Sequence, residues 1–185
     1  MIRLPAHRKD DYIMKVEVVD YNPEWPILFR EEAEKIKGIL GDELIEIHHI
    51  GSTSVENLKA KPVIDIMPVV RDITKIDACN EAFERLGYEP KGEFGIAGRR
   101  FFRKGIEVRT HHVHIFDISN SKEVKRHLAV RDYLRTHPQD AFEYGELKSK
   151  LAAQYPSDIE AYCDGKDAFV KELERKALKW NEEFN

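Results

Sequence analysis

The sequence predicts an α+β fold in which a mostly antiparallel or mixed sheet is built first and a helical lobe follows. Before residue 120, short β-type runs such as 63–70, which is apolar on both faces, are separated by loops. After Asn120 the apolar residues recur at helical spacing as far as Trp180, with breaks at Pro138 and Pro156. The length of 185 residues suits one domain, or one core with a small helical lobe.

The first part of the chain is predicted to supply three strands and two helices. Valine alternates with polar residues over 15–21, which is typical of a half-buried strand. Apolar residues three and four apart over 25–40 predict an amphipathic helix that ends at Gly41. The remaining elements are strands over 44–50 and 63–70 and a helix over 73–86 that ends at Gly87.

Glycines separate β-type runs within 88–119, which predicts a hairpin or meander in this region. A strand over 99–103 is expected to turn at Lys104-Gly105 into a strand over 108–118. About three helices should follow over 121–180. The chain is therefore divided into an N-terminal extension over 1–14, an α/β core over 15–120 and a helical region over 121–185 that packs on the core.

Composition excludes several classes of protein. Apolar residues make up 42% and charged residues 35%, so the chain has enough apolar mass to bury a core. The longest apolar stretch is too short to span a membrane, and the first residues contain no apolar signal segment. Cys79 and Cys163 lie far apart, which excludes a disulfide scaffold and a thiolate zinc site. We therefore expect a cytoplasmic protein.

The first candidate site combines a Gly-Ser pair with a strand carboxylate. Gly51-Ser52 follows a predicted strand, and Asp65 interrupts the apolar strand over 63–70. Glycine lets a phosphate approach the backbone, serine adds a hydroxyl donor, and a carboxylate beside them would hold Mg²⁺. A hairpin turn in which Asp65 only caps or pairs locally is the alternative. A charge inside an apolar strand is costly unless it is paired or metal-bound, which makes Asp65 a candidate.

The second candidate site is a pair of histidines, His112 and His114, which share one face of a predicted strand. Imidazoles at this spacing suit a metal-ligand pair or a general base with a phosphate contact. The alternative is a hydrogen-bonded histidine ladder on a solvated sheet face. Asp65, together with His49 at the end of another strand, favours a shared pocket that could hold a divalent cation.

Basic residues gather around these motifs although the net charge of the chain is −4. Residues 91–116 hold six basic and two acidic residues, and the fork of an arginine such as Arg100 suits phosphate. Arg131 lies in the first predicted helix of the helical region. Two Tyr/Lys pairs four residues apart, Tyr144/Lys148 and Tyr162/Lys166, would each share a helix face. They either project into one cleft or form ordinary amphipathic rims.

Together these segments resemble the GrpB family, which is assigned to the nucleotidyltransferase superfamily. The resemblance covers nearly the whole chain, from about Val16 to Trp180. It runs through YNPEWPILF, IHHIGSTSV, LKAKPVIDI, GRRFFRK, RTHHVHIF, AVRDYLRTHP, YGELKSKLA and AYCDGKDAF. It implies a nucleotidyltransferase-like core with a mixed sheet, flanking helices and a C-terminal helical lobe. Related domains also occur fused to dephospho-CoA kinases, which implies nucleotide or coenzyme metabolism.

The resemblance also assigns roles by position. Gly51-Ser52 matches the Gly-Ser signature of the superfamily, and Asp65 matches the first acid of its Asp-x-Asp strand motif. Met67 stands where the second acid is expected, and the later strand offers His112 and His114 in place of a third acid. Nucleotidyl transfer uses two metal ions held by clustered carboxylates, so the loss of one acid weakens that site.

Three hypotheses follow. In the first, the protein is a metal-dependent nucleotidyltransferase acting on a nucleoside triphosphate and an unknown acceptor, with Mg²⁺ or Mn²⁺ on Asp65, His112 and His114. In the second, the same cleft is a non-catalytic binding module for a nucleotide, a coenzyme or another phosphorylated small molecule, which Met67 favours. RNA binding ranks last, because the chain lacks interleaved aromatic residues. The residues expected to contact the ligand are Gly51, Ser52, Lys61, Arg100, Arg131, Lys148 and Lys166.

Overall fold

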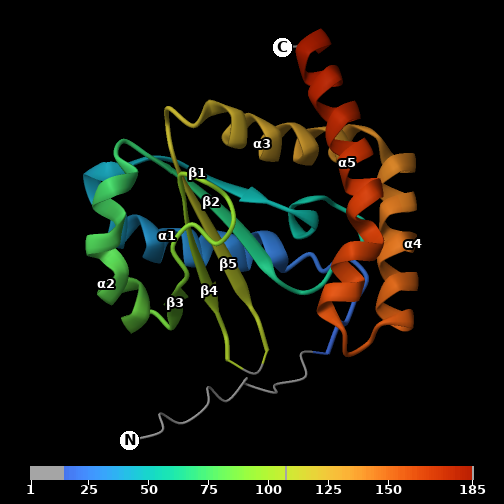
Figure 1. Cartoon of the computed structure of the whole chain (residues 1–185), viewed down its shortest axis with the longest axis horizontal. Helices are drawn as coiled ribbons and strands as arrows, with labels where there is room; N and C mark the ends of the chain where they lie inside the picture. The colour runs from blue at the N-terminus through green and yellow to red at the C-terminus, as the bar shows by residue number, and fades with distance from the viewer. Residues whose placement is uncertain (1–14, 107, 185) are drawn as a thin grey trace, which may run out of the picture.

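The computed structural model describes residues 15–106 and 108–184, so the predicted N-terminal extension lies outside the described residues. A five-stranded sheet with strand order β1-β2-β5-β4-β3 forms its centre (Figure 1). Within the sheet β2 and β5 run parallel, while the other neighbouring strands are antiparallel. The strands are β1 (Leu44–Ile50), β2 (Ile64–Val70), β3 (Tyr88–Pro90), β4 (Arg99–Lys104) and β5 (His111–Asp117).

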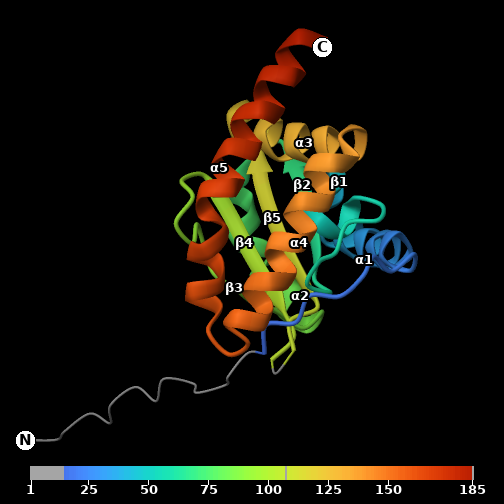
Figure 2. The same cartoon turned by 90° about the vertical axis from the view of Figure 1, so that its right-hand side faces the viewer.

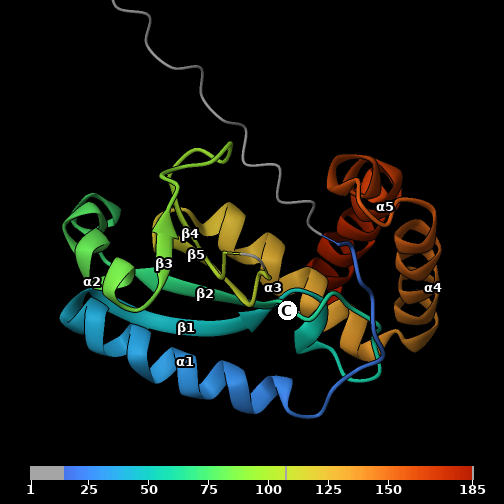
Figure 3. The ribbon, with the colours of Figure 1, turned by 90° about the horizontal axis from the view of Figure 1, so that it is seen from below.

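Helices cover both faces of the sheet. The helix α1 packs against β1 and β2 on one face, and α3 packs against β1 and β5 on the other. Figures 2 and 3 show α4 and α5 side by side, on the same side of the sheet as α3. The helices are α1 (Trp25–Leu40), α2 (Asn80–Arg85), α3 (Ser121–Thr136), α4 (Pro138–Gln154) and α5 (Ile159–Phe184), with short 3₁₀ turns η1 (Gly41–Glu43), η2 (Ser52–Ser54) and η3 (Ile73–Cys79). This mixed sheet followed by helices confirms the predicted α+β class.

The main core fills the space between the sheet and α1, η3 and α2. Fully buried side chains meet there from α1 (Ile36), β2 (Ile66), α2 (Phe83), β4 (Phe102) and β5 (Ile115). Successive residues of a strand point to opposite faces. The side chains at even-numbered positions of β2 therefore enter this core, and those at odd-numbered positions turn toward the helical region.

A smaller apolar cluster lies on that second face. Ile50, Met67 and Phe116 are buried there, against Val124 and Leu128 of α3. Asp65 is on the same face as Met67, one alternation earlier in β2. The second face is therefore apolar under α3 and polar beside Asp65.

Two predicted elements differ in the structure. Residues 15–21 do not form a strand of the sheet, and their single bridge joins Val19 to Ala60. The Val16 N–H instead donates to the carbonyl of Pro156, and its side chain is buried on Leu151 and Tyr162, so helices rather than a neighbouring strand bury it. The predicted helix over 73–86 is a 3₁₀ turn followed by the short helix α2.

No helix in the described part of the chain has the length and apolar character needed to cross a membrane. The helix α5 is the longest at 26 residues, but charged side chains recur along it.

We expect Phe102→Ala to destabilise the fold strongly. The Phe102 ring is 1% exposed and stacks on Phe83 with ring centroids 4.1 Å apart. Removing it should leave a cavity and lower the free energy of unfolding by about 3–5 kcal/mol, measured by urea denaturation. Ile106→Ala is the control, because Ile106 is 80% exposed and its loss should change stability by less than about 0.5 kcal/mol. Equal effects of the two substitutions would contradict this packing.

Candidate functional site

The parallel pairing of β2 and β5 brings the predicted carboxylate and histidines together. Asp65 is the register partner of His112, and His114 follows on the same face of β5. Asp65 Oδ1 lies 3.3 Å from His112 Nδ1 and 3.3 Å from His114 Nε2. One ligand atom from each of the three residues lies within 4.8 Å of the other two, which is close enough for a shared cation. The three residues therefore form a compact polar group.

Electrostatics keep the Asp65 carboxyl group ionised. Burial by itself would raise the pKa of Asp65, but hydrogen bonds and charge interactions with His112 and His114 outweigh it and hold the pKa well below its ordinary value. Burial lowers the pKa of His114, in opposition to Asp65, which acts to raise it. The group thus contains a carboxylate available to a cation or a proton donor.

A glycine allows the backbone to approach this carboxylate. Gly51 has φ +70°, and a Cβ atom at this position would lie 2.5 Å from Asp65 Oδ2. Both facts require glycine at the end of β1. The chain then enters η2, where Ser54 Oγ donates to the carbonyl of Gly51 at 2.6 Å. The predicted Gly-Ser turn therefore lies directly beside Asp65.

A cavity of about 330 Å³ opens beside Asp65, between the sheet and the helical region. Lys148, on α4, is 2% exposed and donates to Ser52 Oγ at 2.7 Å. Lys61 and Lys166 face the Tyr162 ring from 5.4 and 5.2 Å. The lining residues are Gly51, Ser52, Thr53, Ala60, Lys61, Val63, Asp65, His112, Tyr144, Lys148, Tyr162 and Lys166.

The three lysines give this cavity a positive character. Within the described residues, none of Lys61, Lys148 and Lys166 forms an ion pair, and Asp65 is the one acidic side chain in the cavity lining. Burial and then the charges of Lys166 and Lys61 lower the pKa of Lys148 well below its ordinary value. Buried cations without a partner are costly, so this arrangement suits an anionic ligand.

The structure therefore gathers most of the residues predicted from the sequence. Gly51, Ser52, Lys61, Asp65, His112, Lys148 and Lys166 line one cavity, and His114 contacts Asp65. Both Tyr/Lys pairs project into that cavity. Arg131 lines an adjoining cavity of about 120 Å³, which shares Gly51 and Ser52. The Arg131 guanidinium is paired with Asp132 at 2.7 Å and donates to the carbonyl of His49 at 3.3 Å.

Two candidates lie on the opposite face of the sheet. Arg100 forms a bidentate pair with Asp77 of η3, at 2.7 and 2.9 Å. His49 stacks on Phe29 of α1 with ring centroids 4.8 Å apart, and burial lowers its pKa to about 4. Both residues stand one position out of phase with the site on their strands, so the pleat turns them toward α1 and η3.

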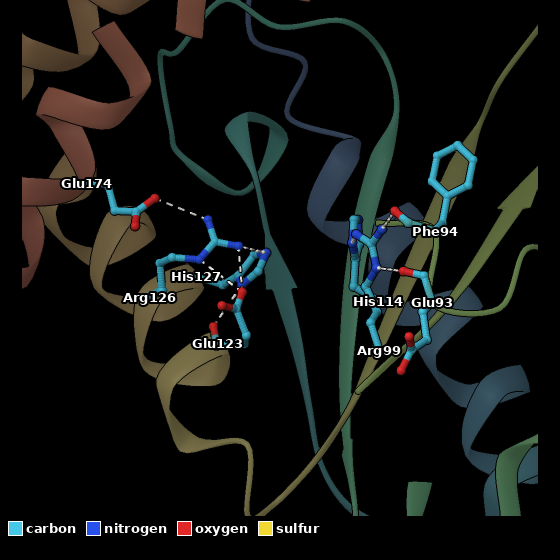
Figure 4. A network of polar contacts seen from close by, with 8 residues as sticks. All are labelled: Glu93, Phe94, Arg99, His114, Glu123, Arg126, His127 and Glu174. Atoms are coloured by element: carbon cyan, nitrogen blue, oxygen red, sulfur yellow. Dashed lines mark hydrogen bonds and ion pairs between the residues drawn. The ribbon is translucent and has the colours of Figure 1, made fainter. Parts of the chain in front are cut away.

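Arg99, one of the six basic residues over 91–116, and His127 adjoin the site, although neither was among the residues expected to contact the ligand (Figure 4). Arg99 is 6% exposed, and its Nη1 lies 3.3 Å from His114 Nδ1. His127 of α3 donates from Nδ1 to the carbonyl of Glu123, and its ring centroid is 6.0 Å from that of His114. Strand alternation on β4 could have placed Arg99 on the same face of the sheet as His114. No sequence signal places α3, and hence His127, over this strand.

The chain is similar in sequence and in structure to proteins of one family. The family model described as GrpB protein matches residues 15–176. UPF0157 protein YqkA of Bacillus subtilis is 49% identical over 171 residues, which cover 92% of this chain and 50% of that protein. The crystal structure of conserved protein GrpB from Enterococcus faecalis has 50% sequence identity and a TM-score of 0.87, with 89% of this chain and 99% of that chain covered.

A more distant relative is described as dephospho-CoA kinase, from Mycolicibacterium paratuberculosis. It is 23% identical over 190 residues, which cover 89% of this chain and 46% of that protein. The chain thus spans about half the length of this relative and of YqkA.

Met67 explains how the fold accommodates the missing second acid. Its side chain is fully buried with Ile50 and Phe116, so the position is part of an apolar cluster. A carboxylate at this position would be isolated from water unless a metal ion or a donor reached it.

We therefore expect Met67→Asp to be strongly destabilising. A buried, unpaired carboxylate should lower the free energy of unfolding at pH 7 by about 3 kcal/mol or more, measured by urea denaturation. Met67→Leu conserves volume and should cost less than about 1.5 kcal/mol. A stable Met67→Asp protein would contradict the apolar character of this position.

Proposed function

We propose that this chain, which belongs to the GrpB family as its motifs predicted, binds the phosphates of a nucleotide or another phosphorylated small molecule in the cavity beside Asp65. The observation that carries the proposal is the group of three lysines that line the cavity with Ser52 and that form no ion pair with any residue the structure describes. A phosphate there would supply the missing negative charge and accept hydrogen bonds from Lys148 and the Ser52 hydroxyl. Because Gly51 has no Cβ, the backbone can lie close to the Asp65 carboxylate next to that phosphate.

A divalent cation, Mg²⁺ or Mn²⁺, is part of the proposal. Asp65 offers a carboxylate oxygen, and the neighbouring imidazoles of His112 and His114 offer nitrogen. Mixed oxygen and nitrogen ligands suit Mn²⁺ better than Mg²⁺, which prefers oxygen ligands. Such an ion would neutralise phosphate charge and polarise the phosphorus that is attacked.

Under the catalytic form of the proposal the protein is a nucleotidyltransferase. The lysines would hold the departing pyrophosphate, Asp65 would hold the cation next to the α-phosphate, and an acceptor hydroxyl or amine would attack that phosphate. The resemblance to the nucleotidyltransferase superfamily and the contact between Gly51 and Asp65 favour this form.

A non-catalytic binding module is the second candidate. Met67 favours it, because the position of the second acid is occupied by a buried apolar side chain. The match to a protein described as dephospho-CoA kinase makes coenzyme A a ligand worth testing beside nucleotides. In this form the same lysines bind the phosphates but no bond is broken.

If the cavity binds an anion, replacing Lys148 should lower the affinity for phosphorylated ligands, whereas replacing an exposed lysine of the same helix should not. Calorimetry with ATP, GTP, coenzyme A and inorganic tripolyphosphate, with and without Mn²⁺, should show binding of at least one nucleotide or coenzyme. Lys148→Met should weaken it by about tenfold or more, because the variant loses the buried amine that would be held charged and hydrogen-bonded by a bound phosphate. Lys150→Met, on the exposed side of the same helix, is the matched control and should change affinity by less than about twofold. Equal effects of both variants would remove Lys148 from the binding site.

An assay of nucleotidyl transfer distinguishes the catalytic form of the proposal from the binding module. With labelled nucleoside triphosphates and a panel of acceptors, the catalytic form predicts label transfer that Asp65→Asn reduces by at least about a hundredfold. Asp77→Asn is the control, because Asp77 pairs with Arg100 on the opposite face of the sheet. Tight binding without transfer supports the binding module, whereas transfer that survives Asp65→Asn excludes Asp65 as the metal-binding carboxylate.

A further inference from the structure

The Arg99 guanidinium is held in a fixed position beside His114. Its Nε donates to the carbonyl of Glu93 at 3.1 Å, and its Nη2 donates to the carbonyl of Phe94 at 2.6 Å (Figure 4). The guanidinium carbon lies 4.7 Å from the centre of the Phe101 ring. No carboxylate pairs with Arg99 among the described residues, and its remaining Nη1 lies 3.3 Å from His114 Nδ1. Backbone carbonyls and an aromatic ring thus aim this nitrogen at the imidazole.

The contact with Arg99 determines which nitrogen of His114 carries the proton. A guanidinium only donates hydrogen bonds, so His114 Nδ1 must accept one with its lone pair. A neutral imidazole then carries its single proton on Nε2. That nitrogen lies 3.3 Å from Asp65 Oδ1, so His114 donates a hydrogen bond to the carboxylate.

This arrangement is the reverse of the one found at metal-binding histidines. A histidine that binds a metal through one nitrogen normally donates the N–H of its other nitrogen to a carboxylate or a carbonyl. If His114 bound a cation through Nε2, its Nδ1–H would face a second donor, Arg99. Two donors facing each other without an acceptor are unfavourable.

His112 has no such constraint. Its Nδ1 lies 3.3 Å from Asp65 Oδ1, and within the described residues no donor is bonded to either of its ring nitrogens. It also lines the cavity that contains the three lysines, together with Asp65. His112 can therefore turn a lone pair toward the same space that the phosphates would occupy.

We infer that the two histidines have different roles: His112 binds the cation together with Asp65, whereas His114, oriented by Arg99, is a positioning residue that holds the Asp65 carboxylate by a hydrogen bond. The role of His112 as a cation ligand rests on the proposed function. The position of the proton on His114 rests only on the contacts of its ring with Arg99 and Asp65. With two protein ligands, the cation site is incomplete, and phosphate oxygens of the bound ligand complete it. The cation and the phosphorylated ligand should therefore bind together, each raising the affinity for the other.

The proton position is tested first, in the metal-free protein. Heteronuclear NMR of the histidine ring nitrogens should show His114 protonated on Nε2 and unprotonated on Nδ1. Arg99→Met should weaken that preference, because only Asp65 then favours the proton on Nε2, whereas Arg85→Met, a change at an arginine that is 72% exposed, should leave it unchanged. A wild-type His114 protonated on Nδ1 overturns the inference, whatever the protein binds.

The metal test compares matched glutamine variants. The terminal amide of glutamine can replace the Nε2–H donor of a histidine but is a poor ligand for a divalent cation. Paramagnetic resonance of Mn²⁺ in the presence of ATP should therefore show affinity lowered by about tenfold or more in His112→Gln and by less than about threefold in His114→Gln. His114→Ala, which removes the hydrogen-bond donor to Asp65, should have a lower Mn²⁺ affinity than His114→Gln.

The outcomes separate this inference from the function on which it rests. If His114→Gln loses as much Mn²⁺ affinity as His112→Gln, both histidines are ligands and the inference is wrong while the cation site stands. If wild type binds neither Mn²⁺ nor any of ATP, GTP, coenzyme A and inorganic tripolyphosphate, the proposed function fails and so does the ligand role of His112. The role of His114 as a donor to Asp65 is still decided by the NMR measurement.

Discussion

The site depends on the parallel pairing of β2 with β5. That pairing sets Asp65 level with His112 and places His114 on the same face, so one register determines the whole polar group. The rest of the fold supports it. Apolar side chains from α1 and α2 cover the other face of the same two strands. On the face that carries Asp65, the apolar cluster around Met67 packs under α3, next to the polar group. A shift of one residue in β2 would bury Asp65 in the main core and turn Ile66 into the cavity.

Two of the three lysines in the cavity come from a different part of the chain than the Asp65 carboxylate. Asp65 and His112 lie on the sheet, whereas Lys148 and Lys166 come from α4 and α5. The sheet thus presents a group suited to a cation, and the helices present groups suited to an anion. Under the proposed function, a metal-bound phosphate, which has both characters, would contact both sets of residues.

The local sequence pattern was enough to predict an element when the spacing of its own apolar residues shows which of its faces is buried. The spacing of apolar residues placed the helix at 25–40 and the strand at 44–50 where the structure has them. The valine pattern of 15–21 predicted a strand wrongly, because Val16 and Val18 pack on helices rather than beside a neighbouring strand. Gly51, Asp65 and the Tyr/Lys pairs could be predicted as site residues from the sequence. A Gly-Ser pair after a strand, a carboxylate inside an apolar strand and the same Tyr/Lys spacing on two helices are all uncommon. Arg100 and His49 were expected near the site but lie on the other face of the sheet, because the face of a strand residue depends on a register that one sequence does not show.

The cavity lies across the contact between the sheet and the helical region, and this has a mechanical consequence. Lys148 already joins the two by its bond to Ser52, but its charge and those of Lys61 and Lys166 repel one another when no anion is present. An anion held among them would replace repulsion with attraction on both sides of the contact. The ligand would then act as a structural clamp between α4, α5 and the Gly-Ser turn, and would stabilise the helical region against the sheet in proportion to how tightly it binds.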